Sequence, residues 1–220
     1  MFRLLAVLLL AVMAASGLAA AQSPVSADLV RAAEAGNLER VSALLRDGIP
    51  VDTRDARRRT ALLAATHANQ VAVARVLLAA GADVNARDDI ADSPFLYAGA
   101  EGRLEILRLI LAQGANLKSV NRFGGTALIP AAHHGHVETV RLLLETAIDI
   151  DHVNRLGWTA LLEAVILGDG GPAHAEIVRL LVAKGARTDI ADREGVTPLQ
   201  HAERRGQTAV VAILKAGGAR

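Results

Sequence analysis

The sequence predicts an all-α fold, a solenoid of six helix-turn-helix repeats whose first and last copies are degenerate. Three phased observations support this prediction. Hydroxyl residues recur every 33 positions and then once after 38, at Thr60, Ser93, Thr126, Thr159 and Thr197. Nine residues after each hydroxyl comes a residue that readily adopts a left-handed backbone, namely Asn69, Gly102, Gly135, Gly168 or Gly206. Seventeen residues after the first three hydroxyls comes an aliphatic pair: Leu77-Leu78, Ile110-Leu111 and Leu143-Leu144.

Each repeat is expected to form two helices. The hydroxyl residue caps the first helix by accepting from an early backbone N–H, and Pro94 and Pro198 occupy the first helical position, where no hydrogen bond is lost. This helix should run for about nine residues and end at the Gly or Asn. The second helix carries apolar residues at three- and four-residue spacing, as at Val137, Val140 and Leu143. Neither helix can bury its apolar face alone, so the copies must stack.

The repeats have recognisable boundaries and departures. We place them at about 24–55, 56–88, 89–121, 122–154, 155–192 and 193–220. The last repeat has Lys215 where the others bury an aliphatic residue, as the exposed end of a stack requires. Pro130 removes one backbone donor early in its helix and is expected to distort the first turn. Repeat five carries five extra residues, Asp169 to Ala173, between its helices.

The first 21 residues are expected to form a cleaved signal peptide, which leaves residues 22–220 as the repeat domain. A basic start at Arg3 precedes an apolar run from Leu4 to Met13, and small residues lead to Ala21. A membrane anchor is the alternative, but the run ends in small residues rather than in a basic cluster. Loss of Arg3 leaves 23 basic and 23 acidic residues, and this balance shows none of the basic excess of a nucleic-acid-binding protein. The chain has no cysteine, so neither disulfides nor a lipid-anchored cysteine is expected.

Three motifs resemble the ankyrin repeat: Thr197-Pro198-Leu199 followed by Ala202, the pair Gly135-His136, and Gly81-Ala82-Asp83. The export signal, the small size and the string from Gly157 to Glu163 also resemble small bacterial periplasmic ankyrin-repeat proteins. The resemblance implies a non-enzymatic protein–protein interaction module of the bacterial cell envelope, periplasmic or secreted and monomeric. It would bind another exported protein, with no nucleic acid, no cofactor and no membrane contact after cleavage. The alternative is an immunity or inhibitor protein that neutralises an exported enzyme or toxin.

The resemblance also implies where a partner would bind: at the turn tips and on the exposed face of the first helices. The aromatic residues Phe123 and Trp158 fall on turn tips that should face solvent, and aromatic anchors of this kind dominate binding energy. The alternative is that both rings only stabilise neighbouring tips. The candidate protein-binding residues are Tyr97, Ile90, Phe123, His133, His134, Leu156, Trp158, Glu163, Ile166 and Leu167.

Catalytic and metal-binding motifs were sought among the remaining polar residues. The sequence has no nucleophile elbow, no phosphate-binding loop and no His-Glu-x-x-His, so we expect neither enzyme activity nor catalytic residues. His133 and His134 are neighbours on a helix and point in different directions, which makes them poor joint ligands, so no metal site is expected. His67 and His201 are expected to be surface residues, and the run Arg57 to Arg59 is expected to be solvated.

Overall fold

The computed structural model describes residues 24–220, and the predicted signal peptide lies outside them. Within this range the chain folds into twelve helices in six antiparallel pairs and forms no strand. Their bounds are α1 Pro24–Glu34, α2 Leu38–Arg46, α3 Ala61–His67, α4 Val71–Ala79, α5 Pro94–Ala100, α6 Leu104–Ala112, α7 Leu128–His133, α8 Val137–Leu143, α9 Ala160–Ile166, α10 Pro172–Ala183, α11 Pro198–Arg204 and α12 Thr208–Ala216. The prediction of an all-α solenoid of six repeats is confirmed.

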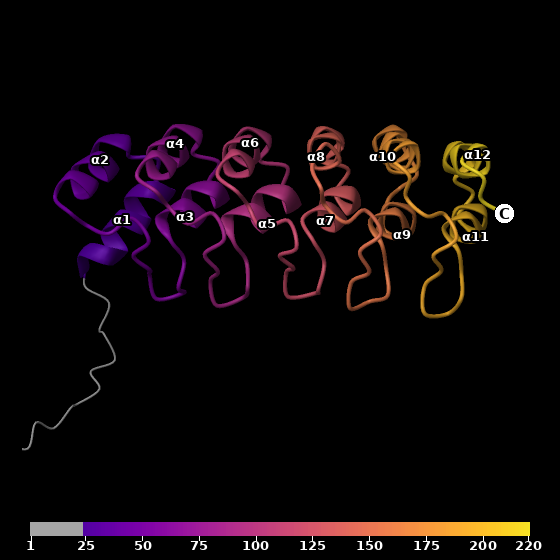
Figure 1. Cartoon of the computed structure of the whole chain (residues 1–220), viewed down its shortest axis with the longest axis horizontal. Helices are drawn as coiled ribbons and strands as arrows, with labels where there is room; N and C mark the ends of the chain where they lie inside the picture. Colours follow the sequence, from indigo (N-terminus) through magenta and orange to yellow (C-terminus); the bar gives the residue numbers. More distant parts are fainter. Residues whose placement is uncertain (1–23) are drawn as a thin grey trace, which may run out of the picture.

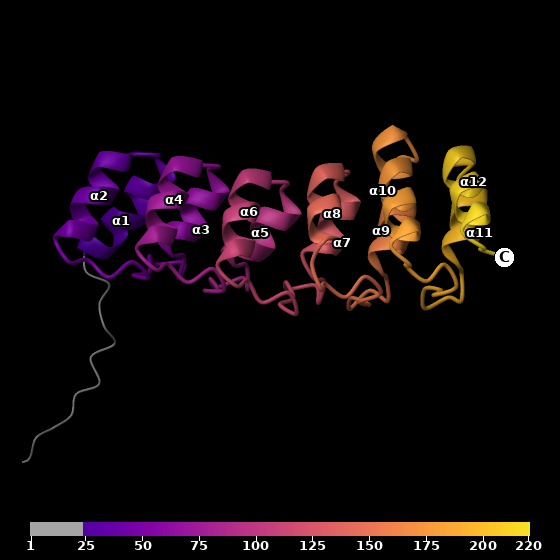
Figure 2. The same cartoon turned by 45° about the horizontal axis from the view of Figure 1, so that its top comes forward.

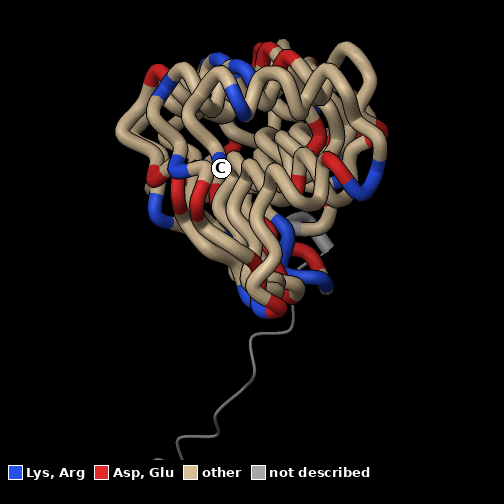
Figure 3. Tube along the Cα trace, turned by 90° about the vertical axis from the view of Figure 1, so that its right-hand side faces the viewer, with Lys and Arg blue, Asp and Glu red and all other residues tan. Residues whose placement is uncertain are grey.

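The pairs stack in a single row. The first helices of the repeats, α1 to α11 in odd numbers, form an inner row, and the second helices form an outer row beside it (Figure 1). The turn tips project together on the side of the inner row, and a turned view shows the same order along the stack (Figure 2). Each helix contacts its counterparts in the repeats before and after it. Charges of both signs are scattered over the outside of the stack (Figure 3).

The hydroxyl caps form as predicted in four of the five repeats that carry them. The side chains of Thr60, Ser93, Thr159 and Thr197 accept from the backbone N–H three residues later, at 3.2–3.3 Å. The capped helices are seven residues long, shorter than the nine expected. The reason is that the residue before the left-handed Asn or Gly already leaves the helix, as Ala68 does ahead of Asn69. A cap and a left-handed stop nine residues apart therefore enclose only seven helical residues.

Repeat four departs from this pattern because of Pro130. In the other capped repeats the N–H four residues after the cap donates to the cap carbonyl, but Pro130 has no N–H to donate. The Thr126 carbonyl instead accepts from Ile129, at 3.2 Å, and α7 begins only at Leu128. The Thr126 hydroxyl is left buried without a hydrogen-bond partner. The expected distortion of the first turn is confirmed.

The five extra residues of repeat five do not all form a loop. Pro172 and Ala173 are the first two residues of α10, which is longer than the other second helices. The Asp169 carboxylate closes the remaining turn by accepting from the Gly171 N–H at 2.8 Å. The left-handed residue here is Gly170, not Gly168 as predicted. A side chain at Gly168 would meet the Ala164 carbonyl oxygen at 2.1 Å, so close packing explains that glycine.

The core runs without interruption along the stack. The residue two positions after each cap is buried, at Leu62, Phe95, Leu128, Leu161 and Leu199. At the carboxyl end Lys215 is exposed and lies 2.9 Å from Glu203. Within residues 24–220, no helix combines the length and the apolar character that crossing a membrane requires.

Arg59 corrects the expectation that the run Arg57 to Arg59 is solvated. It is 7% exposed, and its guanidinium bridges repeats one and two by donating to Glu34 at 2.9 Å and to Asp55 at 2.8 Å. The hydrogen bond from Arg59 holds the pKa of Glu34 below its usual value. Burial raises the pKa of Asp55, but the hydrogen bonds and charge of Arg59 outweigh it, and that pKa also lies below its usual value. Arg59 is therefore a structural residue.

Candidate functional site

The turn tips have a common geometry that decides which of their side chains reach solvent. The side-chain oxygen of an Asp or Asn in each tip accepts from the N–H groups two and four residues later, as Asn121 does from Phe123 at 2.9 Å and from Gly125 at 3.0 Å. The residue two positions after the Asn or Asp is exposed in the central repeats, at Ile90, Phe123 and Leu156. The residue four positions after it turns back toward the stack.

This geometry corrects the expectation for Trp158. Trp158 lies four residues after Asn154, its N–H donates to that side chain at 3.0 Å, and its side chain is half-buried. Arg59 occupies the same register position and is also buried. The exposed apolar residue of the tip is Leu156, 46% exposed, two residues earlier. Phe123, which is 52% exposed, faces solvent as predicted.

A pocket opens on the inner row at repeat four, where two positions carry smaller residues than the matching positions of repeats three and five. The position before the cap is Asp92 in repeat three and Trp158 in repeat five, but Gly125 in repeat four. Four positions after the cap, repeats three and five have Tyr97 and Glu163, and repeat four has only the compact Pro130. Small residues between larger neighbours leave a gap. It measures about 350 Å³ and is walled by α5, α7, α9 and the tips that precede them.

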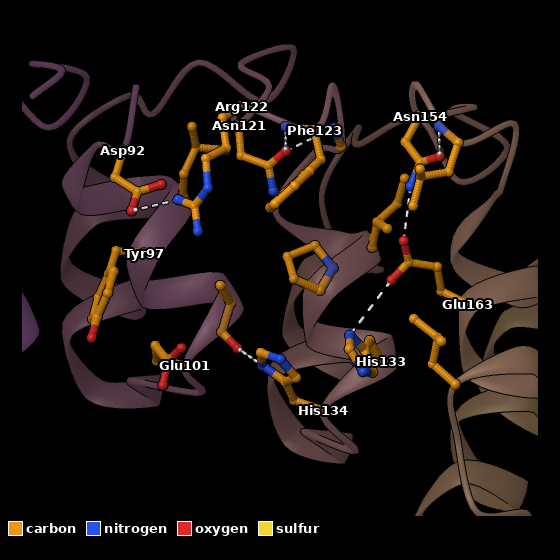
Figure 4. A pocket seen from close by; sticks show the side chains of 17 residues that line it. Asp92, Tyr97, Glu101, Asn121, Arg122, Phe123, His133, His134, Asn154 and Glu163 are labelled. Atoms are coloured by element: carbon orange, nitrogen blue, oxygen red, sulfur yellow. Dashed lines mark hydrogen bonds and ion pairs between the residues drawn. The ribbon is translucent and has the colours of Figure 1, made fainter. Parts of the chain in front are cut away.

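Polar and apolar side chains both line the pocket, and Figure 4 shows polar ones on both sides of it, such as Asp92 and Glu163. We call it the inner pocket. Its apolar lining residues are Leu96, Ala100, Phe123, Ile129, Pro130, Leu156 and Leu167. Its polar and charged lining residues are Asp92, Tyr97, Glu101, Asn121, Arg122, His133, His134, Asn154 and Glu163. The volume lies at the small end of roughly 300–1,000 Å³, the usual range for ligand pockets, and fits one or two side chains of a partner.

Glu163 is the most buried charged group of the inner pocket, at 6% exposure. Its Oε1 accepts from Asn154 Nδ2 at 2.8 Å, and its Oε2 lies 3.8 Å from His133 Nδ1, as the dashed lines of Figure 4 show. Burial raises the pKa of Glu163, against the opposing hydrogen bond from Asn154. Burial lowers the pKa of His133, and His134 and His174 act in the same direction. The His133 contact is longer than a hydrogen bond, and burial disfavours the charged imidazole that would strengthen it.

The opposite wall is held by Arg122. Its guanidinium lies 3.6 Å from Asp92 and 4.9 Å from the centre of the Phe123 ring, which fixes the tip over the pocket. Burial raises the pKa of Asp92, although the charge of Arg122 opposes this. His134 Nδ1 is 2.7 Å from the Ala100 carbonyl oxygen, so that α5 and the end of α7 are joined below the pocket.

The structure brings together most of the candidate residues. Those that line the inner pocket are Tyr97, Phe123, His133, His134, Leu156, Glu163 and Leu167. Three candidates do not line it: Ile90 is exposed on the preceding tip, and Trp158 and Ile166 are half-buried. Gly125 and Pro130 create the space; the sequence pointed to Pro130 only for its effect on its own helix and did not point to Gly125. A comparison of residue sizes at matched positions of the repeats would have found both.

The remaining histidines have structural contacts. His174 bridges Asp169 and the His133 carbonyl oxygen, each at 2.8 Å. His67 stacks on Tyr97 with ring centres 3.8 Å apart, and His201 Nε2 lies 2.6 Å from Asp192, so the prediction of simple surface positions is wrong for both. In the part of the chain that the structure describes, no group of three or more His, Cys, Asp or Glu side chains is arranged to hold a metal ion.

Comparison with known proteins agrees with this architecture. A family model described as ankyrin repeats (3 copies) matches residues 26–88 and 95–187. An ankyrin repeat domain from Acinetobacter baumannii AYE is 52% identical, with a TM-score of 0.85 over 87% of this chain and 98% of that one. EF0377, an ankyrin repeat protein, is 42% identical, with a TM-score of 0.83 over 86% of this chain and 97% of that one.

A shorter match links the chain to a curated protein. The ankyrin repeat protein YahD of Escherichia coli (strain K12) is 42% identical over 57 residues, which are 26% of this chain and 28% of YahD. The match thus spans less than a third of that relative's length. Ankyrin repeats are non-enzymatic binding domains that typically bind other proteins. With a family model matched over more than half of its length, the chain belongs to the ankyrin-repeat family.

Proposed function

We propose that this protein is exported to the bacterial cell envelope, where it binds one partner protein through the inner pocket and the tips around it. The observation that carries the proposal is the coincidence of the pocket with exposed apolar side chains. Phe123, Leu156 and Leu167 are 52%, 46% and 43% exposed, and all three line the same cavity. Large apolar side chains around a concave site are typical of protein interfaces.

The site is tested by filling it. The nearest atoms to a Cβ added at Gly125 belong to Ile129 and Asn121, at 3.5–3.6 Å, and no left-handed backbone opposes the change. Repeat five carries Trp158 at this register position, so Gly125→Trp should fold normally and occupy the inner pocket. Val196→Trp makes the same change in repeat six, outside the pocket, and is the matched control.

The experiment is affinity capture from the periplasmic fraction with chemical crosslinking, followed by titration of the captured partner. We expect Gly125→Trp to weaken partner binding at least about tenfold, because a filled pocket excludes the anchoring side chain. Val196→Trp should bind as the unmodified protein does. Equal binding by all three proteins would place the interface elsewhere on the stack.

Export is tested separately. The pattern of residues 1–21 favours cleavage after Ala21, so protein isolated from the envelope should begin at Gln22. Amino-terminal sequencing checks this directly. Met1 retained on membrane-bound protein would overturn the proposed location and would leave the binding site untouched.

A further inference from the structure

The charges that line the inner pocket are unbalanced. The carboxylates of Asp92, Glu101 and Glu163 share the cavity with a single guanidinium, that of Arg122. Arg122 lies 3.6 Å from Asp92, so these two charges offset each other. Glu101 and Glu163 have no lysine or arginine partner among the residues that line the cavity, which leaves it with an excess of acidic side chains. Arg155 on the next tip donates to the Arg122 carbonyl at 2.8 Å and does not line the pocket.

Glu163 has unused hydrogen-bonding capacity. Asn154 donates to Oε1, whereas Oε2 lies 3.8 Å from His133 Nδ1, which is beyond hydrogen-bonding distance. Tyr97 of α5, Glu101 just after it, and His134 and Arg122 near α7 also line the cavity, and none of them has a hydrogen bond to Glu163 among the described residues. A carboxylate removed from water is costly unless a cation or a donor compensates it. The cavity therefore presents a carboxylate oxygen that a cation of the partner would stabilise.

Aromatic and aliphatic side chains surround this carboxylate. Tyr97 lies on one side, and Phe123, Leu156 and Leu167 form the exposed rim. The long stems of Arg and Lys pack on such surfaces while the charged head reaches a carboxylate, and the guanidinium also stacks on aromatic rings. A cavity of about 350 Å³ accepts one such side chain with a neighbour, but not a folded element.

We propose that the inner pocket binds an extended segment of the partner protein in which an arginine or lysine stands next to an apolar residue. The cationic head contacts Glu163, and the apolar neighbour packs on Phe123 and Leu156 at the rim. This inference rests on the proposed function and adds the chemistry of the segment that is recognised. An acidic segment is disfavoured, because it would bring a like charge to the carboxylates of Glu101 and Glu163.

Three peptides test the proposal: acetyl-Gly-Leu-Arg-Leu-Gly-amide and the same peptide with Gln or Glu in place of Arg. Each is titrated into the isotope-labelled protein, and binding is followed from the backbone amide shifts of residues that line the inner pocket. We expect the Arg peptide to bind about tenfold more tightly than the Gln peptide, the difference that one charge-assisted contact typically makes. The Glu peptide should bind most weakly.

Two variants assign the preference to its residue. Glu163→Gln keeps the Oε1 acceptor for Asn154 and removes the charge, so the Arg and Gln peptides should then bind alike, within about twofold. Glu105→Gln makes the same change on the exposed outer helix α6 and should keep the full preference. Circular dichroism confirms that both variants retain their helices.

Several outcomes would overturn the inference. These are equal binding of the three peptides, an Arg preference that persists in Glu163→Gln, tighter binding of the Glu peptide, or no shift at the pocket with any peptide. If Gly125→Trp abolishes capture of the native partner while the peptides are not discriminated, the proposed binding site stands and only its charge preference is wrong. If Gly125→Trp leaves capture unchanged, the proposed site itself is wrong.

Discussion

Replacing Pro130 by alanine should stabilise the protein. Pro130 removes the N–H that would donate to the Thr126 carbonyl, and the Thr126 hydroxyl is buried without a partner. Repeat two shows the intact arrangement, in which Ala64 occupies the same register position. There the Ala64 N–H donates to the Thr60 carbonyl at 3.0 Å, and the Thr60 hydroxyl caps the helix. Pro130→Ala gives repeat four the residue that repeat two has at this place.

The expected gain is about 1 kcal/mol in the free energy of unfolding. A restored hydroxyl cap contributes about 1 kcal/mol, and the restored backbone hydrogen bond contributes a similar amount. Alanine also gives the unfolded chain more freedom than proline does, which offsets about 0.4–1 kcal/mol. For a domain of this size, a net gain of about 1 kcal/mol raises the Tm by roughly 2–4 °C.

Urea denaturation followed by circular dichroism measures the change, with the Tm as a second readout. The reciprocal variant, Ala64→Pro, is the control, because it removes the same hydrogen bond from a well-formed helix and should cost about 3 kcal/mol. If Pro130→Ala leaves the midpoint unchanged or lowers it while Ala64→Pro is strongly destabilising, the first turn of α7 is not under strain. The account of repeat four would then be refuted.

Other perturbations separate structural residues from binding residues. Arg59→Ala should lower stability at pH 7 by roughly 2 kcal/mol, since it removes the buried guanidinium that contacts both Glu34 and Asp55. Those two carboxyls have depressed pKa values in the folded state, so the stability lost in Arg59→Ala should shrink as the pH falls below their ordinary pKa values of 4.5 and 3.8. A difference between the urea midpoints of the variant and the unmodified protein that stays constant across this range would contradict the prediction. Phe123→Ala should change stability by less than about 0.5 kcal/mol but weaken partner binding at least about tenfold. Trp158→Ala should instead cost roughly 2 kcal/mol of stability and leave binding unchanged. Thermal melts and binding titrations distinguish the two variants, and the reverse pattern would show that Trp158 is the binding residue. Deleting residues 193–220 uncovers α9 and α10, including the buried Leu181, and should make the protein aggregate. Size-exclusion chromatography detects this, and a monomeric, fully helical product would show that repeat six does not cap the stack.

The binding of a basic segment should also depend on pH. Protonation of Glu163 removes the charge that attracts the cation, and protonation of His133 adds a repelling charge, so both events weaken binding as the pH falls. Titration of the Arg peptide between pH 5 and pH 8 measures this. Affinity that rises toward pH 5 would contradict the role of Glu163, and Glu163→Gln should show a flatter profile.

The repeats could be predicted because their signals are local. A hydroxyl such as Thr60 caps the helix that follows it, and a residue such as Gly102 ends one, whatever lies further along the chain. Helix lengths were less predictable, since the residue before the left-handed stop already belongs to the turn. Gly168 was expected to adopt the left-handed backbone that ends its helix, and it does not. Close packing explains it, while the left-handed turn is made by Gly170 within the inserted residues.

The site was predictable at the level of the repeat but not of the individual side chain. Phe123 was expected to be exposed and is, whereas Trp158, assigned to the same kind of position, is half-buried. The two residues lie two and four positions after their Asn, and the hydrogen-bonded tip points these positions in different directions. Arg59 was likewise assigned to solvent, although its carboxylate partner Glu34 comes from the preceding repeat. Such contacts join residues about 25 or more positions apart, beyond any local pattern.

The sequence by itself determined the all-α class, the number of repeats and the need for the repeats to stack, because each depends on periodicity and on caps within a single unit. Only the tertiary structure decided that there is an inner pocket and what lines it. The pocket exists because Gly125 and Pro130 of one repeat lie between Tyr97 of the repeat before and Glu163 of the repeat after. Its charge depends on the fact that Arg122 lies near Asp92 and is not paired with Glu163. Cavities and ion pairs between repeats depend on which side chains of separate units face each other, and only the stacking of the repeats determines that.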